Sequence, residues 1–408
     1  MTSPSAAESN SVPPVPSLAI VALSLSAFAS GLSQRVTDPL LPRLALDFGT
    51  SIGAVSWVVT LFTVGYGLNQ LFFGPIGDRF GKYLVIGWAC IASSVATLLC
   101  AFAPDLPMLL AARFVAGAAI AANIPLAMAW IGDVIPYEQR QPVLARFLIG
   151  QILGVAAGQL LGGIAADYLG WRTPFFLIAA LLVAVGGVLF SVRRRLPAHA
   201  LEVVHGAGHP LRRMFSEFAL VLDDGWVRTL LLTVFLEGAS MFGAFAFFAS
   251  HLHAGLGVSL SAAGSMVMLF GFGGFLFATG SRTLVRRLGE TGLARWGAGI
   301  ICVSLTAVAF GGAWWIAAPA CFTTGLGFYM LHNTLQTNAT QMAPARRGAA
   351  VSAFAFCYFL GQSAGVAAAG LVVGRLGTAG VIVAGGAGVL CVGLAFAGAK
   401  HRRLAAAE

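Results

Sequence analysis

The sequence is poor in charge. Only 10% of its 408 residues are Asp, Glu, Lys or Arg, against about 25% in ordinary globular proteins, while 58% are hydrophobic. A soluble domain buries apolar side chains only up to the volume of its core, and a surface with so few charges would aggregate in water. The surplus apolar surface must therefore face lipid, which excludes an ordinary soluble protein.

Motifs that mark several other classes of protein are also missing from the sequence. The six cysteines lie in apolar segments without a CxxC pair, which indicates small buried side chains rather than a disulfide or metal framework. There is no GxxxxGK[ST] stretch to support ATP-driven transport, and no nucleophile–base cluster. His251 and His253 have no Cys or carboxylate beside them. We therefore expect no enzyme activity, no metal site and no cofactor.

A positively charged leader is missing as well. Residues 1–16 are polar, rich in Ser and Pro, and contain no Lys or Arg, so the AFA at 27–29 does not read as a secretory cleavage site. We expect a disordered cytoplasmic segment over 1–16, followed by an uncleaved first membrane span.

Long apolar runs are what the sequence does contain. A bilayer core of about 30 Å needs about 20 residues of helix. Twelve runs reach that length, six on each side of the polar interval 193–227, and they predict an all-α membrane protein with bundles over 17–192 and 228–399 and a tail over 400–408. The predicted spans are 17–41, 53–73, 83–103, 106–132, 143–166, 173–192, 228–250, 260–280, 290–311, 313–337, 348–373 and 377–399.

The positions of Arg and Lys predict the orientation. With the N-terminus inside, cytoplasmic segments hold nineteen of these residues and the outer loops only three, Arg43, Arg172 and Arg375. Because cytoplasmic loops are enriched in positive charge, both termini are expected in the cytoplasm. The net charge of +9 is thus explained by topology, and no nucleic-acid partner is expected.

The linker over 193–227 contains a pattern typical of an amphipathic helix. Leu211, Phe215, Phe218 and Leu222 follow one another at spacings of four, three and four residues. Such a helix would lie on the inner membrane surface, and a solvated tether is the alternative.

The two halves of the sequence resemble each other at an offset of about 207 residues. DVIPYEQR (133–140) has a counterpart in APARRG (343–348), and glycines recur every four residues in both 154–162 and 361–365. Two six-helix halves related in this way predict the parallel-repeat arrangement of a large class of secondary transporters.

The stretch GPIGDRFGK (74–82), between the second and third spans, is similar to the signature loop of the major facilitator superfamily. Its glycines Gly74 and Gly81 would permit tight turns and close helix contact. The resemblance implies switchable ion pairs that gate the inner face. The implied gate residues are Gly74, Gly77, Asp78, Arg79, Gly81, Lys82, Asp133 and Arg140.

Further stretches strengthen the resemblance and narrow it to twelve-helix drug and sugar efflux permeases, which are proton antiporters. RFVAG (113–117), GWRTPF (170–175) and DPLLPRLALDF (38–48) are similar to motifs of the superfamily. In the fifth span, GQILGVAAGQLLGG (150–163) keeps the antiporter glycines but has Gln159 where that motif has proline. The glycines are expected to let this helix approach the other half, although plain small-residue packing explains them equally well. They are Gly154, Gly158, Gly162 and Gly163.

Ionisable residues inside spans are the main candidates for function, because charge is expensive in hydrocarbon. Asp38, Glu237 and Arg113 are the candidates for proton coupling. Arg35 lies three residues before Asp38, so the two share a helix face and can pair if the first helix runs to about residue 41. A helix that ends earlier would leave both in water. The alternatives are a structural hydrogen bond for Glu237 and a snorkelling side chain for Arg113.

Polar residues in other spans could line a substrate cavity. Helix packing and interfacial hydrogen bonds are their alternatives. The cavity candidates are Arg35, Gln151, Gln159, His332, Asn333, Gln336 and Gln362.

Together these features predict a monomeric, multi-pass protein of the bacterial inner membrane. We expect it to export a small organic molecule in exchange for protons by alternating access, with lipid around it. Proton-coupled uptake of an organic anion is the alternative, with Arg35 and Arg113 receiving the anion.

Overall fold

A computed structural model describes residues 17–201, 218–343 and 346–405, and these residues form helices and turns without strands. The predicted disordered segment 1–16 lies outside the described residues, as do Leu211 and Phe215 of the predicted amphipathic helix. Residues 218–222 are helical, and Phe218 packs against the core of the second half.

The helices fall into two halves along the chain. The first half contains α1 (Ser17–Arg35), α2 (Leu41–Asp47), α3 (Ile52–Val55), α4 (Trp57–Phe80), α5 (Lys82–Ala101), α6 (Leu106–Ile120), α7 (Asn123–Val134), α8 (Tyr137–Ile164), η1 (Ala165–Leu169), α9 (Thr173–Arg193) and η2 (Ala198–Leu201). The second half contains α11 (Gly225–Phe245), α12 (Phe248–Leu256), α13 (Leu260–Phe310), α14 (Trp314–Gln341) and α15 (Arg347–Ala405).

Nine helical stretches of the described residues are long and apolar enough to cross a membrane. Two of them, Leu260–Phe310 and Ala349–Arg403, contain a glycine with non-helical backbone angles, at Gly289 and Gly377, so each crosses twice. With α14, which has the length but more polar residues, the crossings number twelve. The predicted number of spans is therefore confirmed.

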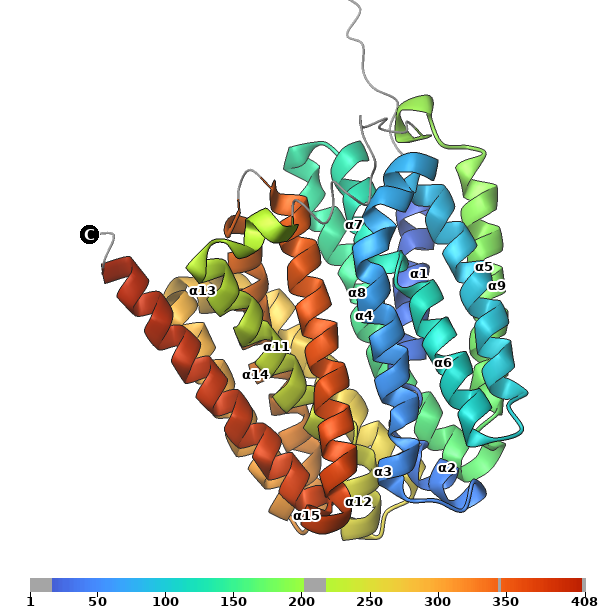
Figure 1. Cartoon of the computed structure of the whole chain (residues 1–408), viewed down its shortest axis with the longest axis vertical. Helices are drawn as coiled ribbons and strands as arrows, with labels where there is room; N and C mark the ends of the chain where they lie inside the picture. Colours follow the sequence, from blue (N-terminus) through green and yellow to red (C-terminus); the bar gives the residue numbers. More distant parts are fainter. Residues whose placement is uncertain (1–16, 202–217, 344–345, 406–408) are drawn as a thin grey trace, which may run out of the picture.

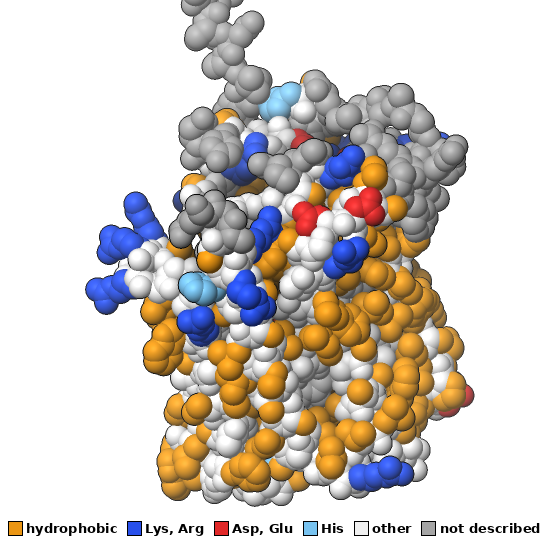
Figure 2. Space-filling view, turned by 60° about the vertical axis from the view of Figure 1, so that its left-hand side comes forward, with side chains coloured by type: hydrophobic (Ala, Val, Ile, Leu, Met, Phe, Trp, Pro, Cys, Tyr) orange, Lys and Arg blue, Asp and Glu red, His pale blue; other side chains and the backbone are white. Residues whose placement is uncertain are grey.

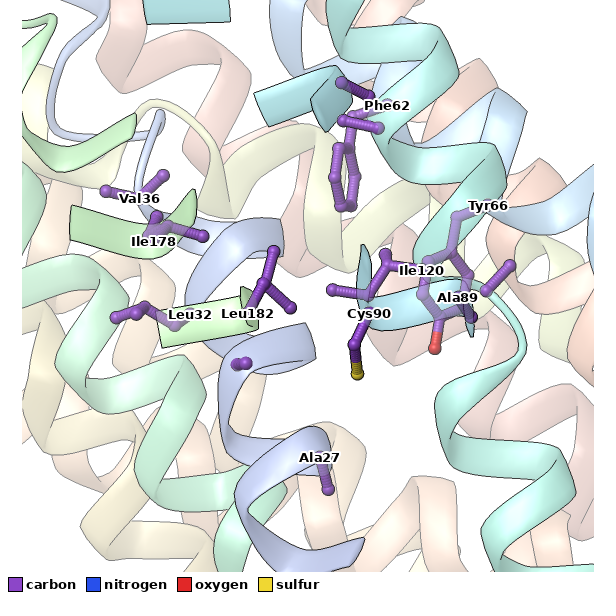
Figure 3. Packing of buried hydrophobic residues seen from close by; sticks show 14 of the residues in the cluster. Ala27, Leu32, Val36, Phe62, Tyr66, Ala89, Cys90, Ile120, Ile178 and Leu182 are labelled. Atoms are coloured by element: carbon purple, nitrogen blue, oxygen red, sulfur yellow. The ribbon is translucent and has the colours of Figure 1, made fainter. Parts of the chain in front are cut away.

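The halves stand side by side (Figure 1), and each has a hydrophobic core; the core of the first half extends across the boundary to residues of the second half such as Phe359 and Val366. In the first half, Leu32, Phe62, Ile120 and Leu182 come together from α1, α4, α6 and α9 (Figure 3). The second core is built in the same way from α11, α13, α14 and α15.

The backbone turns confirm the internal repeat. Among the described residues, six have positive φ, all of them glycines, and they form three pairs separated by 207 or 208 residues. Each pair closes an equivalent turn, because an L residue with a side chain is strained at positive φ. The pairs are Gly49 with Gly257, Gly81 with Gly289, and Gly170 with Gly377.

The two ends of the molecule differ in charge. We name the side that carries the start of α1, the turn at Gly81 and the end of α15 the terminal face, and the side that carries α2 and Gly377 the opposite face. Lys and Arg side chains gather toward the terminal face, whereas the belt below it is mostly hydrophobic (Figure 2). This is the distribution on which the predicted orientation rests.

The prediction that the first helix continues to about residue 41 is wrong. The α-helix ends at Arg35 because Pro39 has no N–H to donate to the Arg35 carbonyl oxygen. The chain then continues through turns closed by hydrogen bonds between residues three positions apart. Asp38 N, for example, donates to Arg35 O at 3.3 Å. The turn is nevertheless buried, so its charges do not lie in water.

The glycine ladder of the fifth span faces a different neighbour from the one predicted. Gly154 and Gly158 lie against α1 and Gly162 against the turn that follows it, all in the same half, and only Gly163 lies against the other half, at Leu260. Contact between the halves at this point also uses Gly264 of α13, which approaches the Gln159 carbonyl oxygen. The sequence pattern shows which positions are small but not which helix each of them meets.

We expect Gly154→Ala to lower the thermal stability of the protein. A Cβ atom at Gly154 would lie 2.1 Å from the Phe28 carbonyl oxygen, so α1 and α8 would have to separate, at a cost of about 1–3 kcal/mol. Gly187→Ala in α9 is the matched control, since a Cβ there meets nothing within 4 Å. The two variants are compared by their melting temperatures in detergent, with size-exclusion chromatography after heating as the measure of the folded fraction. Equal melting temperatures would contradict the tight contact.

Candidate functional site

The predicted pair of Arg35 and Asp38 is present and buried. Arg35 Nη1 lies 3.7 Å from Asp38 Oδ2, and the two residues are 2% and 1% exposed. Gln159 of α8 donates to the same carboxylate oxygen at 2.9 Å. Asp38 Oδ1 has no hydrogen-bond partner among the described residues. The end of α1 therefore presents an ion pair with unused hydrogen-bonding capacity.

Arg35 also connects the two halves. Its Nη2 donates to Gln362 Oε1 of α15 at 2.7 Å, and its guanidinium carbon lies 4.1 Å from the centre of the Phe242 ring of α11. An arginine over an aromatic face gains a cation–π attraction that is larger in a desolvated site. A change in the charge or contacts of Arg35 therefore alters interactions in both halves.

Glu237 of α11 forms a second charged site in the other half. It is fully buried, and its Oε2 lies 2.9 Å from His332 Nδ1 of α14. Its Oε1 has no hydrogen-bond partner in the described part of the chain. The His332 side chain is 14% exposed, so the pair reaches the edge of the buried region. Sequence analysis named His332 only as a cavity candidate, and the structure pairs it with Glu237.

Aromatic rings occupy the space between the two charged sites. The centre of the Tyr358 ring lies 4.5 Å from that of His332 and 5.9 Å from that of Phe242. The Arg35 guanidinium lies over the Phe242 ring. Sequence analysis did not single out Tyr358 or Phe242. The spacing of four residues between Tyr358 and Gln362 was the available signal, because it places both on one helix face.

Arg113 has a different setting from the other charged residues. It is 1% exposed, which excludes a snorkelling side chain, and it donates to the backbone oxygens of Ser33 and Val58 and to Thr37 Oγ1. Its guanidinium carbon lies 4.0 Å from the centre of the Phe62 ring. Arg113 therefore ties α1 to α4 and α6 within the first half.

Other predicted cavity residues are placed at various depths. Gln159 and Gln362 are buried in the contacts above. Gln151 and Asn333 are half-buried and Gln336 is exposed, and the described residues show no side-chain hydrogen bond for these three. They stay candidates for a cavity.

The signature stretch lies at the terminal face. Lys82 bridges two carboxylates, Asp78 at 3.1 Å and Asp133 at 2.7 Å, and so joins α4 to the end of α7. Arg79 lies over the Phe80 ring, and Arg140 donates to the carbonyl oxygens of Gly132 and Ile135.

Of the two glycines expected to make turns or close contacts in the signature stretch, only Gly81 does so. Gly81 has φ 91° and makes the turn between α4 and α5. The expectation for Gly74 is wrong, because Gly74 lies inside α4, where a Cβ would meet nothing within 4 Å. Gly77 is the glycine in close contact, with the Leu126 side chain.

Comparison with known proteins agrees with this architecture. The family model described as Major Facilitator Superfamily matches residues 23–366. An uncharacterised MFS-type transporter of Bacillus subtilis, YceJ, is 26% identical over 85% of this chain and 86% of its own length. The multidrug export protein EmrB of Escherichia coli is 28% identical over 45% of this chain and 38% of its own.

A solved structure shares the fold. The bacterial homologue of the human lysosomal transporter Spinster, in an inward-facing and unoccupied conformation, superposes with a TM-score of 0.70 at 19% identity, covering 95% of this chain and 96% of that one. The matched family and these relatives are transporters rather than enzymes. The twelve crossings, the internal repeat and the family match together show that this chain, a multi-pass membrane transporter, belongs to the Major Facilitator Superfamily.

Proposed function

We propose that the protein exports small organic molecules in exchange for protons. The observation that carries the proposal is the fully buried carboxyl group of Glu237, hydrogen-bonded through one oxygen to His332. A carboxylate without full compensation is costly in a membrane interior, so a group of this kind is suited to bind and release a proton. Several relatives are named as exporters, including EmrB and the efflux pump radE of Floropilus chiversii.

His332 connects Glu237 to the less buried part of the site. Its imidazole contacts the Glu237 carboxylate directly, and imidazole side chains commonly relay protons in proteins. In the proposed cycle a proton reaches Glu237 by way of His332. When Glu237 is protonated and both side chains are neutral, the two halves can move relative to each other. The negative charge on unprotonated Glu237 opposes that movement.

Asp38 and Arg35 are proposed to respond to substrate at the boundary between the halves. The Arg35–Gln362 hydrogen bond crosses that boundary, and both residues are buried. Phe242 and Tyr358 supply apolar contact area beside them. A molecule with an aromatic or apolar body and a few polar groups fits such surroundings.

Uptake of an organic anion is the second candidate. The observation in its favour is Arg35 Nη1, which has no hydrogen-bond partner within the described residues and could receive a carboxylate. Arg113 does not strengthen this candidate, because its donors are directed to the oxygens of Ser33, Val58 and Thr37.

The membrane orientation and the division into parts belong to the proposal. The Lys and Arg residues of the terminal face support a cytoplasmic location for both termini, in a bacterial inner membrane. The two cores support bundles over 17–192 and 228–399 that rock against each other within one monomer. In this arrangement Lys82, Asp78 and Asp133 act in the cytoplasmic gate, together with Arg79 and Arg140.

A proton-flux assay tests the proposal. A thermal-shift screen of lipophilic cations, neutral drugs and organic anions selects ligands, which are added outside proteoliposomes that have an acidic lumen and contain a pH-sensitive dye. Antiport predicts that the lumenal pH rises when the ligand enters, and symport predicts a fall. Protein-free liposomes are the control. A lumenal pH unaffected by any transported ligand would contradict proton coupling.

A further inference from the structure

One carboxylate forms hydrogen bonds across the boundary between the halves at the opposite face. Asp167 belongs to η1, the π-helical turn that follows α8 in the first half. Its Oδ1 accepts from Leu260 N at 3.2 Å, and its Oδ2 accepts from Ser261 N at 2.6 Å. Both donors lie in the first turn of α13, in the second half.

The Asp167 carboxylate helps to cap the N-terminus of α13. The first turn of a helix has backbone N–H groups without partners in the helix and carries a partial positive charge. Ser259 of the same helix accepts from Ala262 N at 3.2 Å, and Asp167 accepts from the two preceding N–H groups. The acceptors for α13 are thus divided between its own half and the other half.

The backbones are close at the same point. A Cβ atom on Gly163 would lie 2.4 Å from the Leu260 carbonyl oxygen, so α8 and the start of α13 touch without side chains between them. Gly53 and Gly370 make a comparable close approach between α3 and α15, where Ser51 caps its own α3 helix. Of these two close contacts, the one between Gly163 and Leu260 also has a carboxylate, Asp167, that forms hydrogen bonds across the halves.

We propose that Asp167 is a latch that holds the opposite face closed. When that face opens during alternating access, the end of α8 must leave the start of α13, and both Asp167 hydrogen bonds must break. Ser259 remains as a cap, and the released N–H groups can bind water. The latch therefore favours the closed opposite face without preventing its opening. This inference requires alternating access but does not depend on the coupling ion or the substrate.

Distances between labels on the opposite face test the latch. Spin labels at Thr50→Cys and Gly312→Cys, both exposed and in different halves, report how far the halves separate there. The background carries serine at the three cysteines that are not buried, which are Cys302, Cys357 and Cys391. Asp167→Ala is expected to raise the ratio of the long-distance to the short-distance population about tenfold, in the range of the loss of a strong helix cap.

The matched control is Asp105→Ala. Asp105 also caps a helix at this face, accepting from Met108 N at 2.9 Å, but that helix is α6, in its own half. It should lower thermal stability without changing the distance populations. Asp167→Asn, which keeps one acceptor oxygen, should give an intermediate ratio and shows whether the folded protein tolerates changes at this position. An unchanged ratio in Asp167→Ala, or an equal shift in Asp105→Ala, would overturn the latch.

Discussion

Glu237→Gln is expected to abolish transport driven by a proton gradient while leaving the exchange of substrate for substrate in place. Glutamine retains the size of the side chain and an oxygen that can accept from His332, but it cannot take up or release a proton. Exchange requires the substrate site and the movement of the halves, and neither requires a change of protonation. The initial rate of gradient-driven uptake into proteoliposomes should fall about a hundredfold, equivalent to about 2.7 kcal/mol.

Glu290→Gln is the matched control for this experiment. Glu290 lies in the same half, near the terminal face, where it contacts Lys400 and accepts from Asn338 at 2.7 Å. Its replacement removes the same charge from a site outside the proposed proton path, so gradient-driven transport should continue. If Glu237→Gln carries out gradient-driven transport at the wild-type rate, Glu237 has a structural role. Loss of exchange as well would point to damage of the substrate site.

The fold was largely predictable because membrane spans are long and their composition is constrained. Every predicted span corresponds to a helical crossing, and the repeat of about 207 residues is reproduced by the paired glycines such as Gly81 and Gly289. The ends of helices were less predictable. Pro39 ends α1 at Arg35, although the apolar residues around it continue for another turn. Local backbone chemistry decides such ends, and hydropathy averages over it.

The candidate site was predictable only where its partners are close in the sequence. The Arg35–Asp38 pair followed from a spacing of three residues. Glu237 and His332 were both noted, but their contact joins residues 95 positions apart and depends on how α11 and α14 are rotated. The bond from Arg35 to Gln362 spans 327 positions and crosses the boundary between the halves. Composition reports the depth of a side chain in the membrane but not the direction in which it points.

Arg35→Met is expected to destabilise the protein strongly. It removes the cation beside Asp38 and leaves a buried carboxylate whose remaining hydrogen bond comes from Gln159. Loss of one partner from a buried ion pair costs about 3–5 kcal/mol, because the other charge stays in a medium of low dielectric. The thermal unfolding temperature in detergent should fall accordingly.

The double variant Arg35→Met, Asp38→Asn separates stability from function. It removes both charges, so it should recover most of the thermal stability lost in the single variant, since a neutral pair has no uncompensated charge to bury. Transport should nevertheless be lost, because the hydrogen bond from Arg35 to Gln362 across the halves and the Asp38 carboxylate are both gone. If the double variant transports at the wild-type rate, the pair of Arg35 and Asp38 only supports the fold. If Arg35→Met alone unfolds at the wild-type temperature, the buried pair does not contribute the expected stability.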